Sequence, residues 1–199
     1  MRRVALVLAT MALALLLASG VAWALTKIGT DGHDVLIGTN ESDNLLGKGG
    51  QDDLFSKDGN DHLLGGPGKD NVLGGDKRRA GGGNKTLVGG TGNDFVAPGR
   101  GSDRALGEEG NDLTGEPTFR EASVDIYSGG SGNDVIFANN RPAAKDVVAC
   151  GDGLDRVLAD RKDVVAGDCE RVYFGLSDEE FVEKIPQSFF QGLPPDPFS

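Results

Sequence analysis

Mostly apolar side chains recur at nine-residue spacing through most of the chain, and each stands two positions after an aspartate or, once, after Lys85. Between these pairs lie glycine-rich turns, and glycine permits a positive φ and a close approach of backbones. A period of nine does not fit the 3.6-residue repeat of a helix. Each unit is therefore predicted to be a turn followed by about three residues of strand with one side chain inward. The recurring positions are Leu36, Leu45, Leu54, Leu63, Val72, Leu87, Val96, Ala105, Thr114, Tyr127, Ile136, Val148, Val157 and Val165.

Fourteen such units lie between residues 29 and 167, the last one shortened and marked by Asp163. A single unit cannot bury its inward side chain, but stacked units bury a continuous apolar column. The chain is therefore predicted to be all-β, with residues 25–172 forming a right-handed parallel β-roll, a kind of β-solenoid. Two units, or about eighteen residues, make one coil, which predicts about seven coils. Residues 173–199 form a short C-terminal tail.

The clearest unit is GGSGNDVIF at residues 129–137, and residues 65–70 and 89–94 match it closely. These stretches resemble the nonapeptide G-G-x-G-x-D-x-U-x of RTX, or haemolysin-type, calcium-binding repeats. The resemblance covers most of residues 29–167, because most units keep the same phase. It implies a β-roll whose turns bind calcium.

Alternate units fall on the same side of a two-unit coil, and the two sides differ. We call one the regular side: its seven turns end in Asp34, Asp52, Asp70, Asp94, Asp112, Asp134 and Asp155, and six of them open with Gly29, Gly47, Gly65, Gly89, Gly107 and Gly129. The other, the variable side, has irregular glycines and carries the inserted residues. Its turns end in Asp43, Asp61, Lys85, Asp103, Asp125, Asp146 and Asp163. The regular side is thus predicted to hold a fixed geometry.

The regular side would stack seven carboxylates one coil apart. At about 4.8 Å and an effective dielectric constant of about 20, each like-charge contact costs about 3 kcal/mol. Calcium relieves this repulsion, because it is a hard cation that binds carboxylate and backbone carbonyl oxygens. We therefore predict that the seven aspartates and the six opening glycines of the regular side bind about six Ca²⁺ ions, one in each gap between turns. Asp43, Asp61 and Asp103 are further candidates on the variable side. The alternative is that all these aspartates are ordinary turn formers.

The first 24 residues predict a secretory signal peptide, with Arg2 and Arg3 before an apolar stretch and Ala22-Trp23-Ala24 as a cleavage signal. The alternative is an N-terminal membrane anchor, although the apolar stretch is short for a span. Cleavage removes two arginines and no acids, so the formal net charge changes from -11 to -13. Such an acidic chain is poorly suited to nucleic acid or an anionic membrane. We expect a secreted monomer without a membrane span after cleavage.

The only two cysteines, Cys150 and Cys169, are 19 residues apart, or about one coil. Neighbouring coils place backbones near enough for a disulfide, and an exported protein favours one. The alternatives are free thiols or half of a metal site. The sequence thus predicts a disulfide that closes the last coil.

The tail begins with a capping box at Ser177 and Glu180, which predicts a short helix with Phe181 and Ile185 on one face. The prolines that follow, Pro186, Pro194, Pro195 and Pro197, are expected to exclude regular structure. Two alternatives stay open for the rest: Phe189, Phe190 and Phe198 cover the end coil, or the tail is disordered.

Enzyme signatures are absent from the sequence, which has neither H-E-x-x-H nor G-x-S-x-G. We therefore expect a secreted calcium-binding protein that folds with calcium and has a structural or binding role outside the cell. One alternative is a secreted RTX-family enzyme or toxin, which would need a domain that the repeats leave no room for. Another is a surface-binding solenoid in which calcium is only structural, with the basic insertion Lys77-Arg78-Arg79 as the place for a partner. The N-terminal signal departs from the C-terminal export signal that the resemblance implies.

Overall fold

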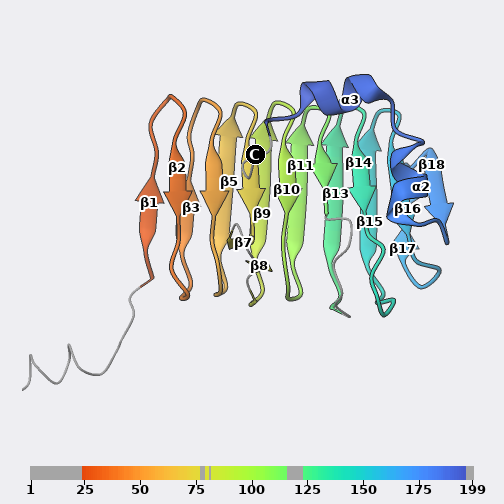
Figure 1. Ribbon diagram of the computed structural model, residues 1–199, viewed down its shortest axis with the longest axis horizontal. Coiled ribbons are helices and arrows are strands. Elements are labelled where there is room, and N and C mark those ends of the chain that lie inside the picture. The colour runs from red at the N-terminus through yellow and green to blue at the C-terminus, as the bar shows by residue number, and fades with distance from the viewer. Residues whose placement is uncertain (1–23, 77–78, 81, 116–122, 196–199) are drawn as a thin grey trace, which may run out of the picture.

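The computed structural model describes residues 24–76, 79–80, 82–115 and 123–195. Over these residues short strands lie side by side along the long axis of the molecule (Figure 1). They form two parallel sheets of eight strands each and one antiparallel hairpin. The chain alternates between the two parallel sheets, so that one strand from each makes a coil.

The strands follow one another across each sheet in chain order. The first sheet consists of β1 (Thr26–Ile28), β3 (Asn44–Leu46), β5 (His62–Pro67), β9 (Thr86–Thr91), β11 (Arg104–Glu109), β13 (Ile126–Ser131), β15 (Val147–Asp152) and β17 (Val164–Val165). The second sheet consists of β2 (Val35–Ile37), β4 (Asp53–Phe55), β6 (Asn71–Leu73), β10 (Phe95–Ala97), β12 (Leu113–Thr114), β14 (Val135–Phe137), β16 (Arg156–Ala159) and β18 (Arg171–Phe174).

The predicted inward side chains form the core between the two sheets. The parallel register aligns Leu54 with Val72 in the second sheet and Leu45 with Leu63 in the first. All four are at most 1% exposed and belong to one continuous cluster that runs through the coils. The nine-residue period is therefore the spacing of residues that enter this core.

The β-roll predicted from the sequence is confirmed, and among the described residues it is one coil longer than expected. The added strands are β1, which precedes the first counted unit, and β18, which follows the last. In β18, Val172 pairs with Val157 in the core register, and Glu170 stands where other units have an aspartate. The handedness of the roll stays a prediction.

Insertions lie on the variable side, where the chain passes from the second sheet back to the first. One of them contains the hairpin of β7 (Gly75–Asp76) and β8 (Arg79–Ala80). Lys77, Arg78 and the insertion at residues 116–119 lie outside the described residues, as does the predicted signal peptide up to residue 23. Among the residues that are described, no helix has the length and apolar character needed to cross a membrane.

The tail starts as predicted. Ser177 caps α2 (Asp178–Val182): its side chain accepts a hydrogen bond from the Glu180 N–H, and the Glu180 carboxylate accepts one from the Ser177 N–H. The expectation that the prolines exclude regular structure is wrong at Pro186, because α3 (Gln187–Gly192) begins directly after it. A proline suits the start of a helix, since its φ is already helical and the first N–H groups have no partner within the helix.

The tail lies along the side of the roll, beside the ends of the strands, instead of over its last coil (Figure 1). Phe181 and Ile185 are buried against Val135, Phe137 and Leu158 on the outer face of the second sheet. Phe189 and Phe190 are half-buried in the same cluster, so the described tail packs against the roll. Phe198 lies outside the described residues.

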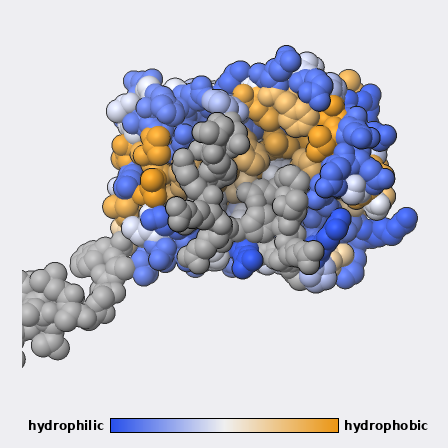
Figure 2. Space-filling model, in the orientation of Figure 1, coloured by the Kyte–Doolittle hydropathy of each residue, from blue (hydrophilic) through white to orange (hydrophobic). Residues whose placement is uncertain are grey.

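Exposed apolar side chains gather at the N-terminal end of the roll, over β1 and β2 (Figure 2). Ile28 is 58% exposed, Val35 53% and Ile37 42%. Both strands pair with a neighbour on one side only, so this end is an open sheet edge in the described structure.

Candidate metal site

A ladder of aspartates runs along the regular side. One carboxylate oxygen, Oδ1, of each aspartate accepts a hydrogen bond from the backbone N–H of the aspartate one coil earlier. These bonds measure 2.7–2.8 Å and link Asp34, Asp52, Asp70, Asp94, Asp112, Asp134 and Asp155 in order. The ladder ends where the Asp155 N–H donates to Glu170 Oε2 at 3.0 Å. The repeated turn thus aligns the seven predicted aspartates in one column.

The other carboxylate oxygen, Oδ2, is buried without a hydrogen-bond donor along most of this column. This holds for Asp52, Asp70, Asp94, Asp112, Asp134 and Asp155. All six residues are fully buried. A buried charged oxygen without a partner is costly, by about 1–3 kcal/mol or more. The column therefore presents a line of oxygens that lack a positive partner.

At the turns of this column that open with glycine, two oxygens approach the glycine closely because it has no side chain. A Cβ placed on Gly47 would lie 2.5 Å from Asp52 Oδ2 and 2.5 Å from the carbonyl oxygen of Gly65 in the next coil. At Gly65 the corresponding distances are 2.5 Å to Asp70 Oδ2 and 2.6 Å to the Gly89 oxygen. We call each such pair of oxygens beside an opening glycine a cradle. The same pair of oxygens lines the cradles at Gly29, Gly89, Gly107 and Gly129, the last with the Cys150 carbonyl.

This oxygen set fits calcium, which takes carboxylate and carbonyl oxygens at 2.3–2.6 Å. Glycine is needed because any side chain would clash with these two oxygens. The two ends of the column differ from its middle. Asp34 Oδ2 already accepts hydrogen bonds from the Thr30 N–H (2.6 Å) and hydroxyl (2.8 Å). At the other end Cys150 replaces the glycine in the turn that ends in Asp155. Five inner cradles, at Gly47, Gly65, Gly89, Gly107 and Gly129, combine a carbonyl oxygen of the next coil with an unpartnered aspartate Oδ2.

The family model of the RTX calcium-binding nonapeptide repeat matches the chain four times, at residues 28–63, 47–76, 79–113 and 122–140. Together these stretches cover just over half of the chain. The chain belongs to the RTX repeat family. It matches no curated protein and no solved structure. The RTX assignment explains the coincidence of stacked aspartates, opening glycines and carbonyl oxygens, because repeats of this family bind calcium.

Burial raises the pKa of the aspartates in the middle of the RTX column. The pKa of Asp70, Asp94 and Asp134 rises to about 7 and that of Asp112 to about 8, with loss of solvation as the largest cause. Neighbouring acids raise the pKa further, as Asp134 does for Asp112. Without a cation these carboxyls therefore resist ionisation, and a bound cation would favour their charged form.

On the variable side, protein groups satisfy the second oxygen at several markers. Asp43 Oδ2 accepts from the Thr39 N–H at 2.5 Å and the Thr39 hydroxyl at 3.0 Å. Asp163 Oδ2 accepts from the Asp160 N–H at 2.6 Å. Asp125 Oδ2 lies 3.4 Å from the Tyr127 hydroxyl, which donates to it. The ligand role predicted for Asp43 thus competes with an internal donor, whereas Asp61 Oδ2, like the inner aspartates of the regular side, is buried without a donor.

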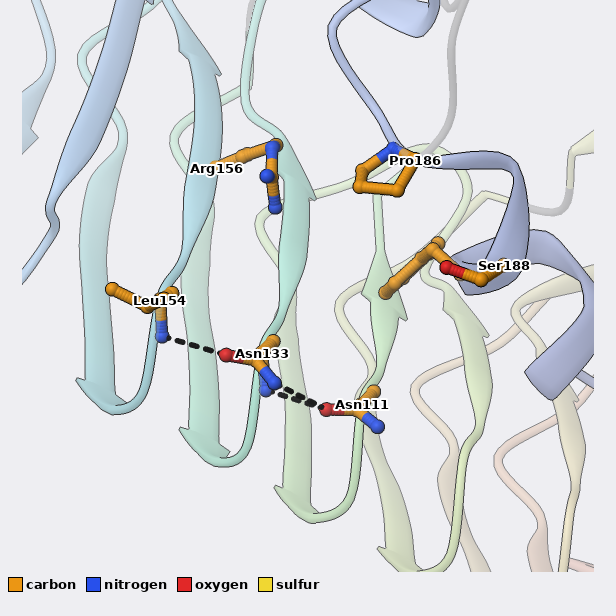
Figure 3. A pocket seen from close by; sticks show the side chains of 7 residues that line it. Asn111, Asn133, Leu154, Arg156, Pro186 and Ser188 are labelled. Atoms are coloured by element: carbon orange, nitrogen blue, oxygen red, sulfur yellow. Dashed lines mark hydrogen bonds between the residues drawn. The ribbon is translucent and has the colours of Figure 1, made fainter.

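A second ladder, of asparagines, was not anticipated from the sequence. It uses the residue just before each of the last four markers on the regular side, from Asp94 to Asp155. The Leu154 N–H donates to Asn133 Oδ1 at 3.0 Å, and the Asn133 N–H donates to Asn111 Oδ1 at 2.7 Å (Figure 3). The Asn111 N–H continues to Asn93 Oδ1 at 2.9 Å. The recurrence of asparagine at this position is the signal that could have revealed it.

The same residues line a pocket between the regular side and the tail. Asn111, Asn133 and Leu154 lie on one wall, and Pro186 and Ser188 of the tail lie across from them (Figure 3). The pocket shows that the tail is seated next to the turns that carry the aspartate column.

The predicted disulfide is confirmed. Cys150 and Cys169 are bonded, with their Cα atoms 5.1 Å apart. The Cys150 N–H also donates to Asp168 Oδ1 at 3.3 Å. The bond ties the coil that ends the column to the chain leading into β18.

Proposed function

We propose that this RTX repeat protein binds calcium ions along the regular side, in the five inner cradles opened by Gly47, Gly65, Gly89, Gly107 and Gly129. Each ion would contact the aspartate Oδ2 of one turn and the carbonyl oxygen of the next. Asp34 is a sixth candidate, where an ion would displace the hydrogen bonds from Thr30. The observation that carries the proposal is the line of buried Oδ2 atoms without donors.

The ions would act as a folding partner. An aspartate Oδ2 and the carbonyl oxygen of the next coil come together only when successive coils are stacked, so calcium binds the folded roll and not the unfolded chain. Binding that is restricted to the folded state stabilises it in proportion to the logarithm of the ion concentration. The protein would therefore be only weakly folded without calcium and fully folded at millimolar calcium.

We further propose that the protein acts outside the cell, in a structural or binding role. The predicted signal peptide, the acidic composition and the disulfide support this location. The family model matches calcium-binding repeats alone, which supports a role for the roll itself.

The test is far-UV circular dichroism of the purified protein in EDTA and then through a calcium titration, with magnesium as the control ion. We expect a cooperative gain of β signal with calcium and a much weaker response to magnesium, which demands a tighter octahedral geometry. Isothermal titration of the folded protein would then count the ions. A chain that is fully folded in EDTA and indifferent to calcium would overturn the proposal.

A further inference from the structure

Lys85 occupies a marker position in the aspartate ladder of the variable side. Its backbone N–H donates to Asp103 Oδ1 at 2.6 Å, as a marker aspartate would. Its side chain is only 2% exposed, the largest fully buried side chain among the described residues. A lysine this deeply buried requires partners for its charge.

The side chain of Lys85 lies beside the opening glycine of its turn, where the cradles of the regular side have an aspartate oxygen. A Cβ placed on Gly74, the glycine that opens this turn, would lie 2.9 Å from Lys85 Cδ. At the equivalent glycine of an earlier variable turn, Gly38, the corresponding neighbour is Asp43 Oδ2 at 2.7 Å. The lysine stem thus lies where other turns place the second carboxylate oxygen, which on the regular side is the oxygen proposed to bind calcium.

The ammonium group is held by oxygens, which are also the ligands of calcium. Lys85 Nζ donates to the carbonyl oxygen of Gly82 at 2.6 Å and to that of Gly83 at 3.3 Å. The markers one coil away on either side are the buried acids Asp61 and Asp103. The charge of Lys85 lowers the pKa of Asp61, against the burial that raises it.

We propose that the Lys85 ammonium is a tethered cation that takes the place of a calcium ion on the variable side. The inference rests on the proposed calcium sites of the regular side, because it treats Lys85 as their covalent counterpart. Two consequences follow for the variable side. The turn that ends in Lys85 binds no calcium ion, and the adjacent acids Asp61 and Asp103 have a positive charge nearby at every calcium concentration. The chain would thus contain one cation position that Lys85 always occupies, in addition to the regular-side sites, which are occupied only when calcium is bound.

Lys85→Asp tests the inference by a gain of function. The substitution restores the aspartate of the repeat between Asp61 and Asp103, so we expect one more bound calcium ion per chain than in the parent, counted by isothermal titration and native mass spectrometry. Lys145→Asp is the matched control, because Lys145 is an exposed lysine beside a marker of the same side and undergoes the same change of charge. We expect the Lys145→Asp protein to bind the parental number of ions. An unchanged count in Lys85→Asp, with the parent binding calcium normally, overturns the inference and leaves the proposed function intact.

Lys85→Met gives a readout that does not need calcium binding. It keeps the stem and removes the charge, so we expect a lower melting temperature in EDTA and the parental number of calcium ions. If the parent binds no calcium, the proposed function fails, and the melting temperature of Lys85→Met in EDTA still decides the role of the lysine. A Lys85→Met protein as stable as the parent in EDTA overturns that role.

Discussion

The two sides of this RTX roll share one pattern of backbone hydrogen bonds and differ, at several turns, in whether the second carboxylate oxygen has a donor. On both sides Oδ1 of a marker aspartate accepts the N–H of the previous marker: the Asp43 N–H donates to Asp61 at 2.9 Å and the Asp94 N–H to Asp112 at 2.8 Å. On the variable side the second oxygen of Asp43 and Asp163 meets a donor from its own turn. On the regular side the second oxygen of Asp94 and Asp112 meets none. At these turns Oδ1 therefore links successive coils by a hydrogen bond, and Oδ2 is free to bind a cation.

The largest expected effect is that protons replace calcium in the calcium-free protein. Burial raises the pKa of Asp70, Asp94 and Asp134 to about 7 and that of Asp112 to about 8. A carboxyl whose pKa is raised on folding binds more protons when folded, so its contribution is most favourable below about pH 4 and is lost as the pH rises toward 8. A pKa that rises by only one unit at each of the four groups changes the free energy of unfolding by about 5 kcal/mol between low and high pH. Thermal unfolding in calcium-free buffer should therefore show greater stability at pH 5 than at pH 8.

Saturating calcium supplies the control for this pH dependence. Because protons compete with the cation for the same carboxylates, the calcium-bound protein should lose stability on acidification over this range. If the calcium-free protein became more stable from pH 5 to pH 8, the aspartate column would not consist of buried carboxyls that bind protons in place of calcium.

The next effect comes from filling one cradle. In Gly65→Ala, the added methyl group would lie 2.5 Å from Asp70 Oδ2 and 2.6 Å from the Gly89 oxygen. We expect the loss of one bound ion and about 3 kcal/mol of stability in calcium. In the control Gly167→Ala, nothing lies within 4 Å of the new methyl group, so the change should stay within about 0.5 kcal/mol. Equal effects of the two substitutions on the calcium titration would argue against the cradles.

A smaller effect is expected when only the second oxygen is changed. Asp112→Asn keeps an Oδ1 acceptor for the Asp94 N–H but replaces the unpartnered Oδ2 by an amide nitrogen. The calcium concentration at half-folding should rise about tenfold, which corresponds to about 1.4 kcal/mol. Asp125→Asn makes the same change on the variable side, where Tyr127 faces the oxygen, and should leave the calcium midpoint unchanged. Similar calcium midpoints for the two variants would erase the distinction between the sides.

The smallest effect should be the same on both sides, because it concerns the backbone alone. Glu108 of the regular side and Lys57 of the variable side have positive φ values of 83° and 74°. Replacing either by glycine should stabilise the roll by about 0.5–1 kcal/mol in EDTA and in calcium, measured by thermal unfolding. Glu108→Ala is the control: it removes the charge without relieving the backbone, and a gain as large as that of Glu108→Gly would assign the effect to charge.

The repeated part of the fold could be predicted because most units repeat the same spacing of turn residues, marker and inward side chain. The nine-residue period places Leu54 and Val72 in the core and Asp52 and Asp70 in one column, without any knowledge of distant contacts. The coil marked by Glu170 was not predicted, because its marker is a glutamate and the nine-residue spacing is lost there. Alignment of the candidate ligands was predictable for the same reason as the core.

Other features depend on contacts that no period reveals. Thr30 and Thr39 each satisfy their own turn's aspartate, which shows only once hydrogen-bond partners are known. The helix after Pro186 docks by apolar side chains onto strands far away in the sequence. Such docking has no local signature, so the sequence left the position of the tail open.

The tail changes how the roll should come apart. A solenoid is a one-dimensional array in which each coil interacts with its nearest neighbours, so its ends can fray independently of its middle. Here Asn139 donates to Asp178 at the start of the tail, while Asn93 and Asn71 donate to Gly192 and Pro195 near its described end. These contacts connect coils that do not touch one another. The tail therefore adds long-range coupling to a linear array, and from β6 onward the coils should unfold as one cooperative unit, while β1 and β2 remain free to fray.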